Sequence, residues 1–426
     1  MSDSVGVPDG WEVRRLGDVA GVVFSNVDKK SYPGKEHHVR LCNYMDVYRN
    51  GYITSRINFM DATANEREIK KFSLLREDVL ITKDSETPDD IAVSAVVDED
   101  LDTVLCGYHL ALIRPHKGIS GRYLSHLFGL NLIQHYYYQV ASGSTRFGLT
   151  TDAIIGSKLP FPPLPEQKKI AAILTSVDEV IEKTAAQISK LRDLKKAMMT
   201  ELLTKGIGHT EFKDSPVGRI PAAWEVVRIE DISEFVTSGS RGWAKYYTGK
   251  GELFVRITNL TRKHINFDLQ SCVYVNPPDS AEGNRTLVKP GDVLISITAD
   301  LGIIGVVSPL FPKAYVNQHI ALVRLKENYQ IDSRWVGHSL CYENVQKQFR
   351  EHNDPGAKAG LNLPSIRLTN IAVPPIDEQA NIIEKLDRLD QLILTKQQKL
   401  TQTKTLKKAL MNDLLTGKKR VKVVVD

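Results

Sequence analysis

The chain has 426 residues, which is long enough for two or three domains with cores of their own and excludes a peptide or mini-protein. Its 42% hydrophobic and 25% charged residues match soluble globular proteins and exclude a disordered or collagen-like chain. The formal net charge of +5 allows a nucleic-acid partner without requiring one.

The sequence carries no membrane or secretory signal. No stretch approaches about 18 consecutive apolar residues, and residues 1–10 lack the basic and then apolar order of a signal peptide. The cysteines Cys42, Cys106, Cys272 and Cys341 lie far apart without a C-x-x-C pair, which favours reduced structural thiols over a zinc site or a disulfide framework. These observations predict a cytoplasmic protein.

Two motifs from the first half of the chain return in the second half. The stretch Pro8–Val19, which contains Trp11-Glu12-Val13, is matched 213 residues later by Pro221–Ile232. The stretch Pro162–Gln167 is matched by Pro374–Gln379, and the offset of 212 then holds without a gap for about forty residues. The chain is therefore predicted to be a tandem repeat of one mixed segment followed by one helical segment.

The first mixed segment, residues 8–160, alternates short apolar runs with turn residues. Asp78–Thr82 and Thr103–Cys106 are predicted to be buried strands, and Tyr123–Tyr138 is predicted to be an amphipathic helix. Its loops carry our first group of candidates for DNA contact: Lys29, Lys30, Tyr32, Lys35, Arg40, Asn43, Ser142, Ser144, Thr145 and Arg146.

The helical segment that follows has apolar residues at alternating spacings of four and three, the heptad pattern of a coiled coil. We call these positions the seam: Ile170, Leu174, Val177, Ile181, Ile188, Leu191, Met198 and Leu202, repeated as Ile382, Leu386, Leu389, Ile393, Leu400, Leu410 and Leu414. Polar residues interrupt the seam and are expected to fix its register: Thr184, Lys195, Lys396, Thr403 and Lys407.

Capping signals mark where both helices begin and end. Pro165-Glu166 suits a first helical turn, Asp377-Glu378 offers an N-cap oxygen, and Gly206 and Gly417 suit C-terminal caps. Each helix is then about 40 residues, or about 60 Å, long. We expect the two copies to pack against each other as an antiparallel pair with a pseudo-twofold axis. Packing of each helix on its own mixed segment, or against another chain, is the alternative.

The second mixed segment, residues 221–372, repeats this organisation. Asp292–Ser296 and Ile303–Val307 are predicted to be strands, and Arg334–Phe349 is predicted to be a helix. The second group of candidates for DNA contact is Ser238, Ser240, Arg241, Trp243, Lys245, Arg256, Asn259, Arg262 and Lys358.

The candidates are residue types that recognise DNA. Arg and Lys pair with guanine and with phosphate, Asn matches adenine, and small hydroxyl residues let the backbone approach a phosphate. A single polar loop residue is more often simply solvated. The prediction therefore depends on recurrence, because Arg40-x-x-Asn43 is echoed by Arg256-x-x-Asn259.

Motifs for catalysis, nucleotide binding and metal binding are incomplete. Asn276-Pro277-Pro278-Asp279 lacks the aromatic residue of an amino-methyltransferase motif, and Gly249-Lys250 lacks the rest of a P-loop. No Asp/Glu-x-Lys follows Pro88-Asp89-Asp90, as a nuclease centre would require. His109 and His319 occupy matching positions without a second ligand at metal spacing and are predicted to be structural. The sequence therefore predicts no catalytic residue and no metal site.

The order of the motifs resembles the DNA specificity subunit of type I restriction-modification enzymes. The resemblance covers nearly the whole chain and is carried by the two Pro-x-x-Glu-Gln helix starts and the two Trp-Glu-Val segment starts. It implies an α+β protein, in which two pseudo-twofold-related α/β target recognition domains are separated by an antiparallel coiled coil of two long helices. The expected parts are target recognition domain 1 (1–161), a central helical spacer (162–205), a linker (206–220), target recognition domain 2 (221–373), a C-terminal helical spacer (374–417) and a basic tail (418–426).

The resemblance also implies function and partners. Each recognition domain would read half of an asymmetric bipartite site in double-stranded DNA, while the helices dock two modification methyltransferase subunits and motor-nuclease subunits join. S-adenosylmethionine, ATP and Mg²⁺ would bind those partners, with no cofactor in this chain. The alternatives are a stand-alone DNA methyltransferase or nuclease with degenerate motifs, and a protein–protein adaptor. The tail Lys418-Lys419-Arg420 is expected to be solvated rather than bound to DNA.

Overall fold

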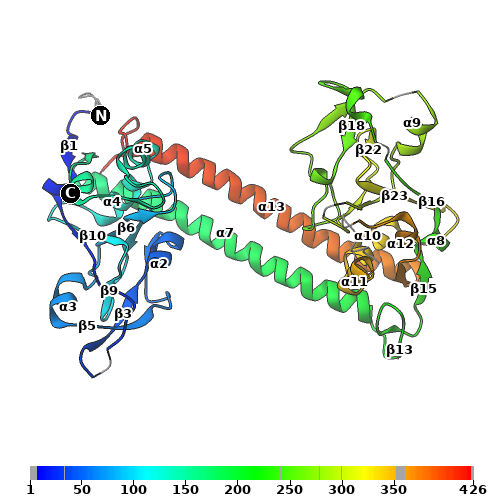
Figure 1. Cartoon of the computed structure of the whole chain (residues 1–426), viewed down its shortest axis with the longest axis horizontal. Coiled ribbons are helices and arrows are strands. Elements are labelled where there is room, and N and C mark those ends of the chain that lie inside the picture. Colours follow the sequence, from blue (N-terminus) through cyan, green and yellow to red (C-terminus); the bar gives the residue numbers. More distant parts are fainter. Residues whose placement is uncertain are drawn as a thin grey trace. The chain divides into compact units, whose positions relative to one another are not determined.

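The computed structural model describes residues 7–32, 34–239, 241–277, 279–298, 300–351 and 360–423. The chain divides into unit 1, which contains Met1–Ala185 and Gln398–Asp426, and unit 2, which contains Ala186–Gln397. Each unit combines one mixed segment with one half of each long helix (Figure 1). Both helical segments therefore contribute to both units.

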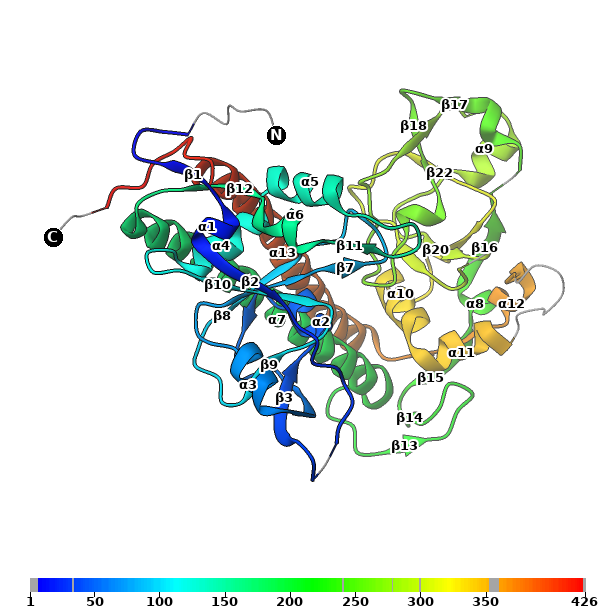
Figure 2. The same cartoon turned by 60° about the vertical axis from the view of Figure 1, so that its left-hand side comes forward.

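Unit 1 is built around a five-stranded sheet with the strand order β2-β10-β6-β8-β4. These strands are β2 (Ala20–Phe24), β10 (Leu110–Pro115), β6 (Val79–Thr82), β8 (Ser94–Val97) and β4 (Tyr52–Ile53). A smaller sheet of β5 (Met60–Ala64), β3 (His37–Cys42) and β9 (Val104–Cys106) lies with α3 (Glu66–Phe72) at one end of the unit, and the antiparallel pair β1 (Glu12–Arg15) and β12 (Lys158–Phe161) lies towards the other (Figure 2). The shorter elements are α1 (Leu16–Val19), α2 (Tyr44–Arg49), β7 (Asp84–Ser85), α4 (Gly121–Phe128), α5 (Asn131–Val140), β11 (Phe147–Gly148) and α6 (Thr151–Ile155).

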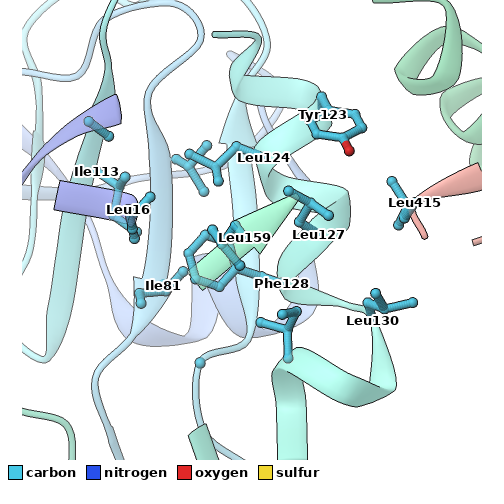
Figure 3. Close-up of a cluster of buried hydrophobic side chains, with 14 of the residues drawn as sticks. Leu16, Ile81, Ile113, Tyr123, Leu124, Leu127, Phe128, Leu130, Leu159 and Leu415 are labelled. Atoms are coloured by element: carbon cyan, nitrogen blue, oxygen red, sulfur yellow. The ribbon is translucent and has the colours of Figure 1, made fainter. Parts of the chain in front are cut away.

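The large sheet of unit 1 is covered on both faces. Ile81 and Ile113 belong to one core cluster, in which Phe128 of α4 also lies (Figure 3). Their neighbours Leu80 and Leu112 belong to a second cluster on the opposite face. Burial on both faces explains why these strands read as continuous apolar runs rather than as an alternating pattern.

The central sheet of unit 2 has the same strand plan as that of unit 1, whereas the second sheet differs. The sheet β16-β23-β20-β21 corresponds to β2-β10-β6-β8, and the pair β15·β24 corresponds to β1·β12. Its elements are β13 (Phe212–Lys213), β14 (Ile220–Pro221), β15 (Glu225–Arg228), α8 (Ile229–Ile232), β16 (Ser233–Ser238), η1 (Trp243–Tyr246), β17 (Tyr247–Thr248), β18 (Glu252–Val255), η2 (Ile257–Asn259), β19 (Val273–Val275), α9 (Ala281–Thr286), β20 (Val293–Ser296), β21 (Ile304–Val306), β22 (Ala314–Val316), β23 (Ile320–Leu325), α10 (Ser333–Cys341), α11 (Glu343–Glu351), α12 (Leu363–Arg367) and β24 (Asn370–Val373). A second sheet, β17-β19-β18-β22, replaces the three-stranded sheet of unit 1. The predicted α+β fold with a duplicated domain is thus confirmed.

The long helices are α7 (Leu164–Lys205) and α13 (Ile376–Leu414), of 42 and 39 residues. In unit 1, Asp178 of α7 forms an ion pair of 2.5 Å with Lys407 of α13. In unit 2, Lys195 of α7 forms an ion pair of 2.5 Å with Asp390 of α13. In unit 2, Lys396 of α13 also donates to Gln187 of α7, so residue numbers fall along α13 as they rise along α7, and the two helices pair in opposite directions, as predicted. At the repeat offset of 212, Asp178 corresponds to Asp390 and Lys195 to Lys407. Each ion pair is therefore the repeat equivalent of the other, with the helices exchanged.

All residues predicted for the seam are buried or half-buried, and so are the polar residues that interrupt it. Near the ends of the helices the seam also packs on a domain. Ile170 and Leu414 belong to the main core cluster of unit 1, while Ile382 and Leu386 belong to that of unit 2. Both arrangements considered from the sequence therefore occur together, because each helix packs on a domain near its ends and on the other helix along the seam.

The repeated sequence motifs meet in space. Trp11 Nε1 donates a hydrogen bond of 3.3 Å to Glu166, and Trp224 Nε1 donates one of 3.0 Å to the equivalent Glu378. The start of each mixed segment is thus hydrogen-bonded to the first turn of the long helix that follows the segment: Trp11 to α7 and Trp224 to α13. These motifs hold the scaffold together.

The glutamine of each Pro-x-x-Glu-Gln motif connects a helix to the loop before α4 or α10. Gln167 accepts a hydrogen bond from the Ser120 amide and donates to the Pro162 carbonyl. Gln379 makes the equivalent bonds with Asp332 and Pro374. Both glutamines are buried, with 2% and 0% of their surface exposed, so these bonds satisfy polar groups that water cannot reach.

Two details differ from the sequence predictions. The segment expected to be one helix after β10 is two, α4 and α5, and its counterpart is α10 and α11. In each break a glutamine side chain, Gln134 or Gln346, donates to a carbonyl at the end of the first helix and so stabilises the interruption. Asp377 lies inside the first turn of α13 rather than at its N-cap. Gly206 and Gly417 have the positive φ, 63° and 73°, that suits the predicted caps.

The basic tail is not simply solvated, contrary to expectation. Arg420 makes two hydrogen bonds, of 2.7 and 2.8 Å, to Glu166 and lies over the ring of Trp11. In unit 2 the linker residue His209 takes the equivalent place, at 3.0 Å from Glu378. A cation or imidazole thus completes each Trp–Glu contact.

Candidate nucleic-acid interface

In unit 1, strand pairing brings several loops to one edge of the domain. β11 pairs with β7, so that Phe147 lies opposite Ser85, and Ser142 bridges to Gly148. The loop between these bridges presents the candidates Ser142, Ser144, Thr145 and Arg146, and all four are exposed. The structure therefore places this predicted group on an accessible loop at the end of a rigid sheet.

Aromatic residues of α2 lie beside this loop. The rings of Tyr44 and Tyr48 stack at 5.7 Å, and the Tyr48 hydroxyl donates a hydrogen bond of 2.8 Å to Asp90. Burial raises the pKa of the Tyr44 hydroxyl, while the nearby positive charge of Arg146 acts in the opposite direction. An arginine and a stacked tyrosine pair thus share the edge, and both groups can contact bases or phosphates.

Lys83, Asp84 and His109 form a polar cluster next to the same edge. Asp84 contacts Lys83 at 2.7 Å and His109 at 2.6 Å. Burial alone would raise the pKa of Asp84, but hydrogen bonds from Lys83 and His109 lower it below its ordinary value. Tyr108, with 49% of its surface exposed, packs edge-on against His109. Lys83 and Tyr108 were not among the predicted candidates; Lys83 directly follows the predicted strand Asp78–Thr82, and Tyr108 directly precedes His109.

The lysine-rich loop of unit 1 forms a separate group. Lys29, Lys30, Tyr32 and Lys35 are exposed on the loop before β3. Asn43 follows the other end of this six-residue strand, about 20 Å away at about 3.3 Å per residue. Tyr32 and Lys35 therefore lie away from the edge around Arg146, whereas Lys29 comes two residues after Val27, whose carbonyl accepts a hydrogen bond from the Tyr108 amide at that edge.

Arg40 and Asn43 have structural partners. Arg40 donates a hydrogen bond to the Asp102 carbonyl and lies over the ring of Phe59. Asn43 forms the capping box of α2 with Asp46 and donates to the Leu41 carbonyl. Both residues are half-buried, so their first role is to hold β3 and α2 in place.

In unit 2, the exposed candidates are Arg241 and Lys245, on either side of Trp243, and Arg262. Ser238 is half-buried at the end of β16, and Arg256 is half-buried before η2. Arg262 forms an ion pair with Asp300 and also donates to the Leu301 carbonyl. Ser240 and Lys358 lie outside the described residues, as does Pro278 of the predicted turn.

Two candidates of unit 2 are buried in the structure. Trp243 is 3% exposed, stacks on Phe254 at 5.5 Å and donates its indole hydrogen to Glu282. Asn259 is fully buried, and its amide donates to the carbonyls of Asp268 and Ser271. Neither side chain is exposed, so a DNA contact by either would need local unfolding.

No three His, Cys, Asp or Glu side chains among the described residues are arranged to hold a metal ion. No helix in the described part of the chain is long and apolar enough to cross a membrane.

Comparison with known proteins decides the family. The profile of the type I restriction modification DNA specificity domain matches the chain twice, over residues 8–192 and 221–404. The chain belongs to this family. Both matches extend from a mixed segment into the helix that follows it, as the sequence repeat does.

Other members of the specificity-subunit family match the chain along nearly its whole length. It is 28% identical to the MjaX specificity subunit of Methanocaldococcus jannaschii, over 98% of this chain and 95% of that protein. The EcoKI specificity subunit of Escherichia coli is 19% identical, over 90% and 82% of the two chains. The crystal structure of an S subunit from M. genitalium covers 97% of this chain and 98% of its own with a TM-score of 0.61 and 13% identity. At that identity the structural match shows the fold alone.

Proposed function

We propose that the chain is the DNA-recognition subunit of a type I restriction-modification complex and reads an asymmetric bipartite site. One observation carries the proposal: two units of one family fold each present exposed arginine or lysine residues on loops around a rigid sheet. Arg146 is such a residue in unit 1 and Arg241 in unit 2. Arginine on a firmly held loop can read guanine or bind phosphate.

The two reading edges differ in composition, which supports an asymmetric site. Unit 1 presents a stacked tyrosine pair and the loop 142–146, whereas unit 2 presents Arg241 and Lys245 around a buried tryptophan. A homodimer would read a palindrome, because both of its edges would be identical. One chain with two different edges would instead read two different half-sites.

The chemistry of the complex is assigned to partner subunits. The sequence lacks a complete methyltransferase, P-loop or nuclease motif, and the proposal places methyl transfer, S-adenosylmethionine, ATP and Mg²⁺ on methyltransferase and motor-nuclease subunits. The paired helices serve as the spacer between half-sites and as the place where two methyltransferase subunits dock.

Binding of DNA duplexes by the complex of this chain with its methyltransferase subunit tests the proposal. Arg146→Ala and Arg241→Ala should each weaken specific binding about 5–150-fold, if each removes a base contact of about 1–3 kcal/mol, and each should relax a different half-site. Arg228→Ala, which removes an exposed arginine at the end of β15 that pairs with Glu230, is the control and should bind normally.

Two outcomes would support the alternatives. Methyl transfer to DNA by the purified chain alone would favour a stand-alone methyltransferase. Absence of salt-dependent duplex binding by the complex would favour a protein–protein adaptor, because phosphate contacts by Lys and Arg make affinity fall with salt.

A further inference from the structure

His109 of unit 1 has a strained backbone. Its φ is 72°, in the left-handed region that residues other than glycine rarely adopt. Residues in such conformations persist where surrounding contacts fix them, and they gather at functional sites. The turn 107–109 joins β9 to β10, so the strained residue lies at the start of a central strand of the sheet. The contacts that hold its ring therefore bear on its role.

Asp84 and Lys83 hold the ring of His109. The Asp84 carboxylate lies 2.6 Å from His109 Nδ1 and 2.7 Å from Lys83 Nζ. The Lys83 side chain is 12% exposed, and its ammonium group lies over the rings of Phe24 and Tyr108 at 5.4 and 5.2 Å. Because Lys83 already balances the charge of Asp84, the imidazole can make its hydrogen bond as a neutral ring.

The hydrogen bond to Asp84 determines which nitrogen of the neutral ring carries the hydrogen. Burial acts to raise the pKa of Asp84, but hydrogen bonds from Lys83 and His109 lower it, so the group is an ionised carboxylate that only accepts hydrogen bonds. Nδ1 then carries the hydrogen, and Nε2 keeps a free lone pair. No described residue forms a hydrogen bond with Nε2, and 32% of the His109 side chain is exposed. The cluster thus offers a hydrogen-bond acceptor in a fixed position.

This acceptor lies beside the exposed loop that carries Arg146. Asp84 in β7 pairs with Gly148 in β11, the strand that follows the loop. Tyr108, directly before His109, is 49% exposed. An arginine, an aromatic ring and the imidazole acceptor therefore share one accessible edge of unit 1.

Unit 2 keeps the histidine but lacks the carboxylate that orients it. His319 occupies the equivalent turn and contacts Gln318 at 3.0 Å. Counted from the matching strands β6 and β20, Thr298 stands at the position of Asp84. A structural role common to both turns explains why each has a histidine, but it does not explain the cluster around His109. A feature of one unit alone is what the reading of two different half-sites requires.

We propose that His109 Nε2 accepts a hydrogen bond from the exocyclic amino group of a base, and that Asp84 is the positioning residue that keeps Nε2 an acceptor. In the major groove the amino groups are N6 of adenine and N4 of cytosine, whereas guanine and thymine present carbonyl oxygens. Because an acceptor is repelled by a carbonyl oxygen, the contact selects adenine or cytosine. The proposal rests on the proposed function and adds a base-contacting residue outside the arginine loop, together with the class of base.

Duplexes that lack single amino groups test the proposal. The full chain is bound to its methyltransferase subunit, and the half-sites are taken from mapped methylated DNA. One set of duplexes replaces each adenine by purine, and a second set replaces each cytosine by 2-pyrimidinone. For the wild-type complex, one replacement in the half-site of unit 1 should lower the affinity about 5–150-fold through loss of the His109 contact. The set that contains this position distinguishes adenine from cytosine.

His109→Gly should remove this effect. The variant should bind the natural duplex about 5–150-fold more weakly, and loss of the amino group should then cause little further change, as expected for two coupled groups. Glycine adopts a φ of 72° without strain, so the Tm should stay close to that of wild type. His319→Gly, the same change in the equivalent turn of unit 2, is the matched control and should leave the response in the half-site of unit 1 unchanged.

Asp84→Asn tests the positioning role separately. An amide can donate as well as accept a hydrogen bond, so the ring can also take the form in which Nε2 is a donor. This variant should therefore tolerate guanine or thymine at the position, rather than bind every duplex equally weakly. A wild-type base preference in Asp84→Asn would overturn the role of Asp84.

Two results would overturn the contact by His109. One is an unchanged response to loss of each amino group in His109→Gly, and the other is a loss of affinity in that variant that is the same for all duplexes, as a structural role would give. In both cases sequence-specific binding by the wild-type complex would still support the proposed function. A wild-type complex without any sequence preference would overturn the recognition function and this contact together.

Discussion

The ion pair between Lys195 and Asp390 should be the most sensitive contact of the helix pair. Its side chains are 11% and 2% exposed, and Lys195 has one further acceptor, the Lys263 carbonyl. Asp390→Ala would leave the ammonium group buried without a counter-ion. Breaking a buried pair in this way costs about 3–5 kcal/mol. For a unit of this size we expect the Tm of unit 2 to fall by about 6–20 °C.

The double variant Lys195→Met with Asp390→Leu should recover most of this loss. It removes both desolvation penalties and adds apolar seam contacts, so its stability should lie within about 1 kcal/mol of wild type or above it. Asp178→Ala in unit 1 should cost less, about 1.5–3 kcal/mol. Its partner Lys407 is 25% exposed and so better screened by water.

Urea unfolding followed by tryptophan fluorescence measures these differences. Trp224, Trp243 and Trp335 lie in unit 2 and Trp11 in unit 1, so the signal reports mainly the unit that contains Asp390. The double-mutant cycle isolates the pair from other effects of each substitution. A loss below about 1 kcal/mol for Asp390→Ala, or a double variant as unstable as the single one, would refute the assignment of a buried, coupled pair.

Three further predictions concern pH, pairing and spacing. Asp387 accepts hydrogen bonds from Arg334 and His338, which outweigh the effect of its burial and lower its pKa to about 2. The folded state should therefore gain about 2 kcal/mol from this carboxylate above pH 4 and lose it as the pH falls from about 4 to 2. Urea unfolding measured over this pH range should show a flatter stability profile for Asp387→Asn. A fragment that ends near Gly206 should dimerise, because Lys195 of one copy can form an ion pair with Asp178 of the other. A monomeric mass measured by light scattering would contradict the repeat symmetry of the ion pairs. An insertion of four residues within 176–200 should lengthen the preferred spacer between the two half-sites. The sites that the assembled complex methylates give the spacer length. An altered half-site with an unchanged spacer would contradict this prediction.

The helix pair and the tandem repeat could be predicted because their signals are local. Apolar residues at heptad spacing define a seam whatever packs on the outside, and the seam polar residues Lys195 and Lys407 proved to form the interhelical ion pairs. The partners of these lysines could not be read from the sequence. They depend on which residues meet after an antiparallel turn of the whole chain, and no local pattern encodes that distance.

The reading edges were harder to predict, because exposure is a property of the tertiary structure. Trp243 and Asn259 have residue types suited to DNA, yet packing places them inside unit 2. Tyr108 and Lys83 lie next to the loop 142–146, but only strand pairing between β7 and β11 brings that loop to them. Side-chain type alone therefore selected both exposed and buried residues.

The residues that recur between the two halves stabilise the fold of each unit and are not the best candidates for base recognition. The Trp–Glu contact and the seam ion pairs recur because each unit must fold in the same way, and the recurring Asn43 and Asn259 serve in capping and in loop hydrogen bonds. If the two units read different half-sites, the residues that discriminate between bases should differ between the halves. Neither Arg146 nor Arg241 is kept as arginine in the other half, where Arg146 corresponds to Lys358, so these exposed residues are better candidates than the repeated Asn43 and Asn259.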